Sequence, residues 1–179
     1  MVHVTPVAPF ECETLMKPVQ QNQIGSFVQT LDELRACVGK EAFVTDWVDI
    51  SQERVDMFAH ATEDFQWIHI DEEKAATESP FGGTIAHGFL TLSLLGKFAA
   101  EHMSLPFAAM GINYGVNRVR FTHPVRVGQR VRGRFTLAQL DDLPGGVQLT
   151  FEVIIEIDGI ERPACVAQTI TRQYFEAQV

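Results

Sequence analysis

The chain has 179 residues, a length typical of one domain with or without an extension. Its formal net charge is −9, which sets nucleic acids and anionic membrane surfaces aside as main partners because both carry dense negative charge. Hydrophobic residues make up 46% of the chain, enough for a sizeable core, yet no apolar run is long enough to indicate a membrane-spanning helix.

The N-terminal part of the chain differs in character from the rest. Residues 1–26 mix Pro, Val, Gln and Met without periodicity, which predicts an irregular arm. We expect residues 27–179 to form a single domain. A short helix should open this domain, because Thr30 and Glu33 match a capping box and Gly39 suits a helix end.

A strand, a helix and an irregular segment are predicted next. Residues 43–50 have the composition of a strand, and Ser51 can cap the helix that follows. One face of that helix is apolar and is formed by Val55, Phe58, Ala59 and Thr62. Residues 63–88 are broken by Pro80, Gly82 and Gly83. An irregular segment of this length inside a compact domain is usually functional.

The second half of the chain predicts one helix and several strands. Residues 88–102 carry apolar side chains on nearly every face, so this helix should be buried by its surroundings. Strands are predicted over residues 112–122, 130–138, 147–157 and 163–175. Turns are predicted at 141–146 and at 158–159. The sum is an α+β domain with an antiparallel sheet wrapped around one apolar helix, which is a hot-dog fold.

The cysteine pattern and the N-terminus indicate a compartment. Cys12, Cys37 and Cys165 are widely spaced and form no CxxC motif, which argues against a disulfide framework. The N-terminus has no basic region followed by an apolar run, so no secretory signal is visible. We therefore expect a protein of the cytoplasm.

Asp64 and His69 are the candidate catalytic pair. Four residues of the irregular segment separate them, a spacing that suits no single helix face but that a bent loop can bring to one point. Hydration of an activated double bond needs a base to take a proton from water and an acid to give one to the neighbouring carbon. Histidine can do either near neutral pH, and a carboxylate beside it can orient the ring and share the water.

The start of the helix at 88–102 is the candidate binding site for a developing negative charge. The first backbone N–H groups of a helix have no internal partner, and Gly88 would let a thioester carbonyl approach them closely. Gly88 could equally serve tight helix packing. His87 is a second candidate for the site, and Asn113 either faces a ligand or closes a strand.

Other chemistries are less well supported by the sequence. His60, Asp71 and the residues above lack any metal-binding spacing, so we expect no metal site. Gly82-Gly83-Thr84 is not followed by the lysine of a phosphate loop. The arginines between residues 118 and 134 could contact the phosphates of coenzyme A, or could simply line a solvent-exposed strand face.

The two motifs together resemble the MaoC-like family of (R)-specific enoyl-thioester hydratases and dehydratases. The resemblance rests on the Asp64-x₄-His69 spacing followed by Asp71, and on the run Pro-Phe-Gly-Gly-Thr-Ile-Ala-His-Gly at 80–88. It extends over residues 27–174. It is strongest for the branch of nodulation protein N and mycobacterial 3-hydroxyacyl-thioester dehydratases, which shares Gln-Trp-Ile-His before Asp71 and Asn-Tyr-Gly at 113–115.

The resemblance implies a role for each motif residue. Asp64 and His69 take the place of the family's catalytic pair, and Gly88 that of its oxyanion-binding amide. Family members are hot-dog homodimers that join their sheets edge to edge, and their site lies at the subunit interface. They use no cofactor, because coenzyme A is part of the substrate. Some members hold the Asp with a Ser at the position of Gly96, so the support of Asp64 should differ here.

These observations predict an enzyme that interconverts 2-enoyl-CoA and (R)-3-hydroxyacyl-CoA thioesters by acid/base catalysis with Asp64 and His69. A hot-dog thioesterase is the alternative enzyme, because the same fold hosts both chemistries. A non-catalytic protein that binds acyl thioesters is the alternative outside enzymology.

Overall fold

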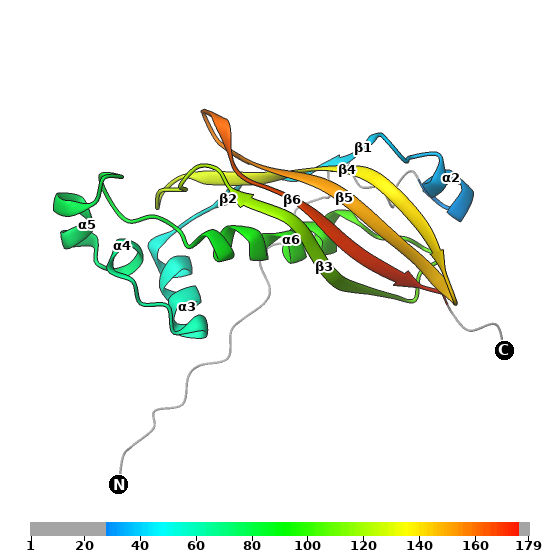
Figure 1. Ribbon diagram of the computed structural model, residues 1–179, viewed down its shortest axis with the longest axis horizontal. Helices are drawn as coiled ribbons and strands as arrows, with labels where there is room; N and C mark the ends of the chain where they lie inside the picture. The colour runs from blue at the N-terminus through cyan, green and yellow to red at the C-terminus, as the bar shows by residue number, and fades with distance from the viewer. Residues whose placement is uncertain (1–27, 176–179) are drawn as a thin grey trace, which may run out of the picture.

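The described part of the chain, residues 28–175 of a computed structural model, forms one antiparallel sheet that curves around a long helix (Figure 1). The sheet has six strands in the order β1-β4-β5-β6-β3, and β2 also pairs with β4. This is the α+β hot-dog arrangement that the sequence predicts. The arm predicted for residues 1–26 lies outside the described residues.

The long strands β4 (Arg130–Leu143), β5 (Gly146–Ile157) and β6 (Ile160–Tyr174) form the centre of the sheet. Their inward positions are filled by apolar side chains, the largest of which are Phe135, Leu137, Leu149, Phe151 and Ile155. Burying such a side chain is worth about 1.5–3 kcal/mol, so this face accounts for much of the core. The predicted turn at 141–146 is tighter than expected, because Leu143 already pairs with Gly146.

The prediction of one strand over residues 43–50 is wrong in one respect, because the structure has an interruption there. The chain here forms β1 (Glu41–Val44) and β2 (Val48–Asp49), both antiparallel to β4. At the break, Thr45 N–H donates to the Gly133 carbonyl, and the Thr45 hydroxyl accepts from Gly133 N–H at 2.9 Å. A side-chain oxygen thus takes the place of a backbone acceptor, and the regular ladder stops there.

The outer face of the sheet carries paired charges. Arg132 and Arg134 both contact Glu156, at 2.6 and 3.1 Å, and Arg130 pairs with Asp158. The Arg132 guanidinium also lies 4.5 Å from the centre of the Trp47 ring. Of the two roles that the sequence leaves open for these three arginines, the structure favours a charged strand face, because each already has a carboxylate partner.

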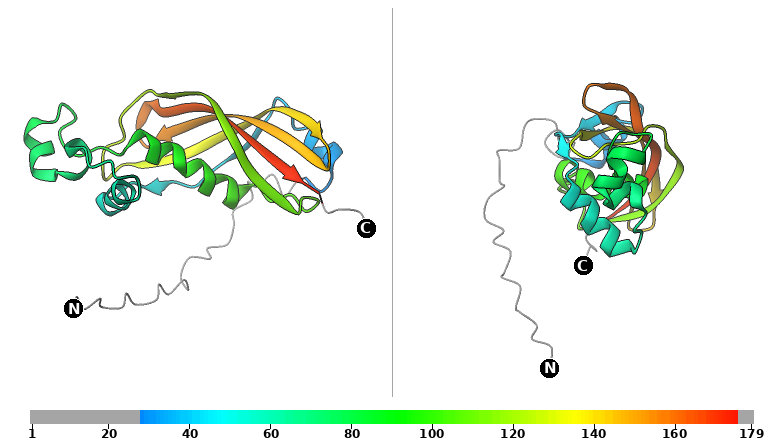
Figure 2. Two further views of the ribbon diagram at one scale, coloured as in Figure 1. Left: turned by 60° about the horizontal axis from the view of Figure 1, so that its bottom comes forward. Right: turned by 90° about the vertical axis from the view of Figure 1, so that its left-hand side faces the viewer.

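Short helices precede the long one. Thr30 caps α2 (Leu31–Arg35) through a complete capping box, and Ser51 caps α3 (Gln52–Thr62), as predicted. The segment after α3 contains α4 (Trp67–Ile70) and α5 (Glu72–Glu78). Figures 1 and 2 show α3, α4 and α5 gathered beyond one end of the sheet. No helix within residues 28–175 is long and apolar enough to cross a membrane.

The long helix α6 (Gly88–His102) lies in the hollow of the sheet (Figure 2). It buries Leu90, Thr91, Leu94, Leu95 and Phe98. The prediction that this helix is covered on all sides is wrong for the chain alone, because Phe89 and Ser93 are exposed. The sheet can enclose only one side of a helix. The open side lies next to the edge strand β3 (Met110–Phe121), whose side chains are also largely exposed.

The close approach between α6 and the sheet depends on the absence of a side chain at Gly133. A methyl group there would lie 2.9 Å from the Phe98 ring and 2.6 Å from the Phe135 ring. Gly133→Ala should therefore lower the free energy of unfolding by about 1–3 kcal/mol through overpacking. Gly96→Ala is the matched control, since its methyl group meets no atom closer than 3.7 Å and alanine favours a helix. Equal stability of the two variants in urea, at one protein concentration, would contradict this account.

Candidate active site

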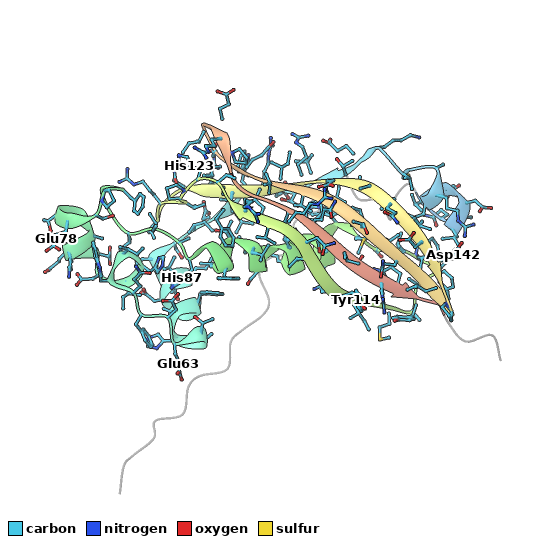
Figure 3. The ribbon with its side chains drawn as sticks, viewed as in Figure 1. Glu63, Glu78, His87, Tyr114, His123 and Asp142 are labelled. Carbon is cyan, nitrogen blue, oxygen red and sulfur yellow. The ribbon has the colours of Figure 1, made fainter. Side chains whose placement is uncertain are left out.

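Asp64 is positioned by the end of α3. The helix ends at Glu63, which adopts a left-handed conformation with φ of 58°. A non-glycine residue in this region is strained by about 1–3 kcal/mol, and such strain is typical of functional sites. The turn leads Asp64 toward the beginning of α6, where Figure 3 places His87 between Glu63 and the sheet. The Asp64 side chain remains 55% exposed in the single chain.

His69 lies on the short helix α4 and is buried. Its Nδ1 is 2.7 Å from the carbonyl oxygen of Ile85. A carbonyl only accepts, so Nδ1 carries the proton and Nε2 of the neutral ring is left with a free lone pair. Burial lowers the pKa of His69, as does the neighbouring His87, while the Ile85 hydrogen bond and Asp64 oppose this shift. The ring is thereby held as a neutral base with a defined tautomer.

His87 ties Asp64 and His69 together. Its ring is only 2% exposed and stacks on that of His69, with 3.8 Å between the centroids. Its Nε2 donates to the backbone carbonyl of Asp64 at 3.0 Å and lies 3.9 Å from the carboxylate. This contact holds Asp64 in place. Gly96 lies eight residues along α6 from Gly88, next to Asn113.

The functional atoms of three side chains converge. One carboxylate oxygen of Asp64 and one ring nitrogen each of His69 and His87 all lie within 4.8 Å of one another. Two polar atoms at such a separation can share a water at about 3 Å from each. The Nε2–H of His87 is donated to the Asp64 carbonyl, so this nitrogen offers no lone pair to a metal ion, and the arrangement suits a shared water better.

A pocket of about 280 Å³ opens beside His69. Gly88 and Thr91 of α6 line it, together with Phe121 and the segment 122–125. The backbone N–H of Gly88 makes no hydrogen bond to any residue of the described range 28–175. It stands at the positive end of α6 and is available to an oxygen atom in the pocket.

The absence of a side chain at Gly88 has a packing reason as well. A Cβ atom there would lie 2.8 Å from the Phe121 ring, which forms one wall of the pocket. The sequence leaves two roles open for Gly88, namely tight packing and binding of a developing negative charge. The Phe121 contact establishes the first role, and the free N–H is compatible with the second. His87 lines no part of this pocket, and Asn113 lies in a different one.

Two contributors to the site were missed by sequence reasoning. The Ile85 carbonyl orients His69, and a backbone acceptor leaves no signal in side-chain identity. Gln52 binds two parts of the site, because its amide donates to the His69 carbonyl at 2.7 Å and accepts from the Thr84 hydroxyl at 2.6 Å. Its place in the first turn of α3 gave no sign of this role, since contacts between distant segments are not readable from spacing.

Comparison with known proteins gives a consistent result. The family described as MaoC like domain matches residues 35–153. The 3-hydroxyacyl-thioester dehydratase Z of Mycobacterium tuberculosis is 46% identical over 145 residues, which are 80% of this chain and 95% of that protein. Nodulation protein N of Rhizobium leguminosarum bv. viciae is 45% identical over 149 residues, which are 82% of this chain and 92% of that protein.

A solved structure supports the fold assignment. The (R)-hydratase from A. caviae involved in PHA biosynthesis superposes with a TM-score of 0.62 and 27% sequence identity, covering 75% of this chain and 94% of that one. The family match spans more than half of the chain, and this solved structure shares the fold. The chain therefore belongs to the MaoC-like dehydratase family.

Proposed function

We propose that this protein is a hydratase/dehydratase that interconverts 2-enoyl-CoA and (R)-3-hydroxyacyl-CoA thioesters. The observation that carries the proposal is the meeting of Asp64 and His69 beside a helix N-terminus whose Gly88 N–H has no partner in the described chain. The family supports the reaction class, since a relative that is 46% identical over 145 residues is named a 3-hydroxyacyl-thioester dehydratase.

The residues divide the chemistry between them. In hydration, Asp64 and the free Nε2 of His69 hold the attacking water, and the pair takes its proton as the oxygen adds to C3 of the enoyl group. Negative charge develops on the thioester oxygen, where Gly88 N–H and the α6 dipole stabilise it. The pair then returns a proton to C2. The reaction is redox-neutral and is balanced by water alone, so we propose that no cofactor takes part.

A direct assay separates this function from the two alternatives. Crotonyl-CoA should lose its enoyl absorbance without release of free thiol. A thioesterase would release thiol, and an accessory protein would bind the thioester without turnover. The pocket contains no serine or cysteine nucleophile among its described lining residues, which favours hydration over a covalent acyl transfer. We also propose that the protein acts in the cytoplasm, where the free thiols of Cys37 and Cys165 would stay reduced.

Substitutions of Asp64 and His69 test their assignment as the catalytic pair. Asp64→Asn removes a proton acceptor at nearly constant volume and should lower kcat for crotonyl-CoA hydration about 10²–10⁴-fold. His69→Ala should act likewise, and the double variant should lose much less than the product of the single losses. Circular dichroism serves as the control that the fold is retained. A near wild-type kcat in Asp64→Asn would show that the pair is wrongly assigned.

The pH profile of hydration tests the role of His69 as the base. Only neutral His69 can accept a proton, and its pKa lies below the usual 6.5 because its ring is buried. Hydration kcat/KM should therefore stay constant from neutral pH downward and fall only below pH 6.5. In Asp64→Asn the pKa of His69, followed by NMR, should fall further, since Asp64 raises it. An acid limb centred above pH 6.5 would contradict the assignment of His69 as the base.

We further propose that the protein is a homodimer joined along β3. This strand is the last in the sheet order, and its exposed apolar residues include Met110, Ile112, Val116 and Phe121, next to Phe89 of α6. An unpaired apolar edge of this kind is normally covered by another chain. A second copy would cover the strand and the open side of α6 together.

Light scattering at micromolar concentration should give the mass of a dimer. Val116→Lys places a charge on the edge strand and should shift the protein toward monomer. Ile154→Lys is the matched control, because Ile154 is similarly exposed but lies on the central strand β5. A monomeric wild type, or equal behaviour of both variants, would rule out the β3 interface.

A further inference from the structure

A second pocket, of about 300 Å³, lies between the C-terminal half of α6 and the beginning of β3. Gly96, Ala99 and Ala100 line it from α6, Asn113 lines it from β3, and Thr171 and Gln173 line it from β6. The pocket beside His69 uses the N-terminal end of the same helix and the last residue of the same strand. Both pockets therefore lie along one line between α6 and β3. The eight residues from Gly88 to Gly96 span about 12 Å of helix.

Among the mostly apolar residues that line the second pocket, two buried polar side chains lack hydrogen-bond partners in the described chain. Thr171 is 3% exposed, and its hydroxyl makes no hydrogen bond within residues 28–175. Gln173 is 6% exposed, and its amide forms no side-chain hydrogen bond to the described part of the chain, whereas the amide of Asn113 is exposed to solvent. A buried polar group without a partner destabilises a protein by about 1–3 kcal/mol. The buried Thr171 hydroxyl and Gln173 amide thus call for a hydrogen-bonding ligand.

The glycine at position 96 is an independent indication that the second pocket binds a ligand. Glycine within a helix is less stable than alanine by about 1 kcal/mol. Gly88 and Gly133 are explained by rings that pack against them, but a Cβ atom at Gly96 would come no closer than 3.7 Å, to the Asn113 amide. Nothing in the described chain requires glycine here. Its effect is to leave room beside Asn113.

The chemistry of the pocket limits its occupant. No described lining residue is charged. A hydroxyl group and two amides can each donate and accept, so they match a neutral oxygen group such as a hydroxyl or a carbonyl. A carboxylate or phosphate would lose its hydration without a cation to replace it.

We propose that this pocket is the distal acyl subsite, and that the enzyme prefers acyl chains with a neutral hydrogen-bonding oxygen group about 12 Å from the thioester. The inference rests on the proposed function, because a thioester carbonyl held at Gly88 directs the acyl chain into the line between α6 and β3. Thr171, Gln173 and Asn113 are then specificity-determining residues, and Gly96 provides the space.

The test compares pairs of 2-enoyl-CoA substrates of equal length, one ending in a methyl group and the other in an ω-hydroxyl, from hexenoyl to hexadecenoyl. The hydroxylated member should have a higher kcat/KM, by about fivefold, at the lengths that reach the pocket, and no advantage at the shortest. Binding of the saturated, unreactive dodecanoyl and ω-hydroxydodecanoyl thioesters, measured by calorimetry, gives the same ratio without turnover.

Two variants locate the effect. Thr171→Val keeps the shape and removes the hydroxyl, so it should abolish most of the fivefold preference. Thr169→Val is the matched control, because Thr169 is 7% exposed on the same face of β6 but lines neither pocket, and it should keep the preference. Thermal unfolding checks that both variants fold.

The outcomes separate this inference from the proposed function. Equal kcat/KM and equal affinity of both members at every length would overturn the subsite, as would an unchanged preference in Thr171→Val. Failure to hydrate crotonyl-CoA would instead contradict the proposed function, and the calorimetric ratio would still decide whether the pocket binds a polar acyl chain.

Discussion

The packing of α6 into the hollow of the sheet is the constraint on which the rest of the structure depends. Phe98 is fully buried against the sheet, and Gly133 lets the helix approach it closely. Once the helix is fixed, so is its N-terminus, where His87 and Gly88 stand. The free N–H groups and the positive dipole end of α6 thus have a defined position before any ligand arrives, which is the condition for electrostatic stabilisation without reorganisation.

The site is assembled on this helix start by hydrogen bonds to backbone carbonyls. The Ile85 carbonyl accepts a hydrogen bond from His69 Nδ1–H, and the Asp64 carbonyl accepts one from His87 Nε2–H. These two bonds, together with the stacking of the rings, join α4, the end of α3 and the start of α6. A general base must be neutral and fixed in orientation. Burial lowers the pKa of His69, and the hydrogen bond to Ile85 fixes the orientation of its ring. The strained Glu63 turn is consistent with a loop held by its surroundings.

One side of the molecule is left incomplete by the chain itself. The open side of α6 and the edge strand β3 present apolar side chains that call for a covering surface, and the pocket at Gly96 presents polar groups that call for a ligand. Apolar and polar groups are sorted along this side. A homodimer would cover the first set and leave a passage lined by the second, so assembly and substrate selection would depend on the same strand.

Local features of the sequence determined much of this protein. The caps at Thr30 and Ser51, the bounds of the helix at 88–102 and the alternation of the long strands follow from short-range rules of capping and periodicity, and the structure agrees with them. The Asp64–His69 spacing and the run before Gly88 likewise identified the family, because both motifs are contiguous in the chain. Only the tertiary structure decided the interruption at Thr45, the one-sided burial of α6 and the separation of Asn113 from the catalytic pair. The same holds for the hydrogen bonds by which Gln52 joins His69 to Thr84. Each depends on contacts between segments far apart in sequence, and such contacts are set by how the sheet curves around the helix rather than by any local pattern.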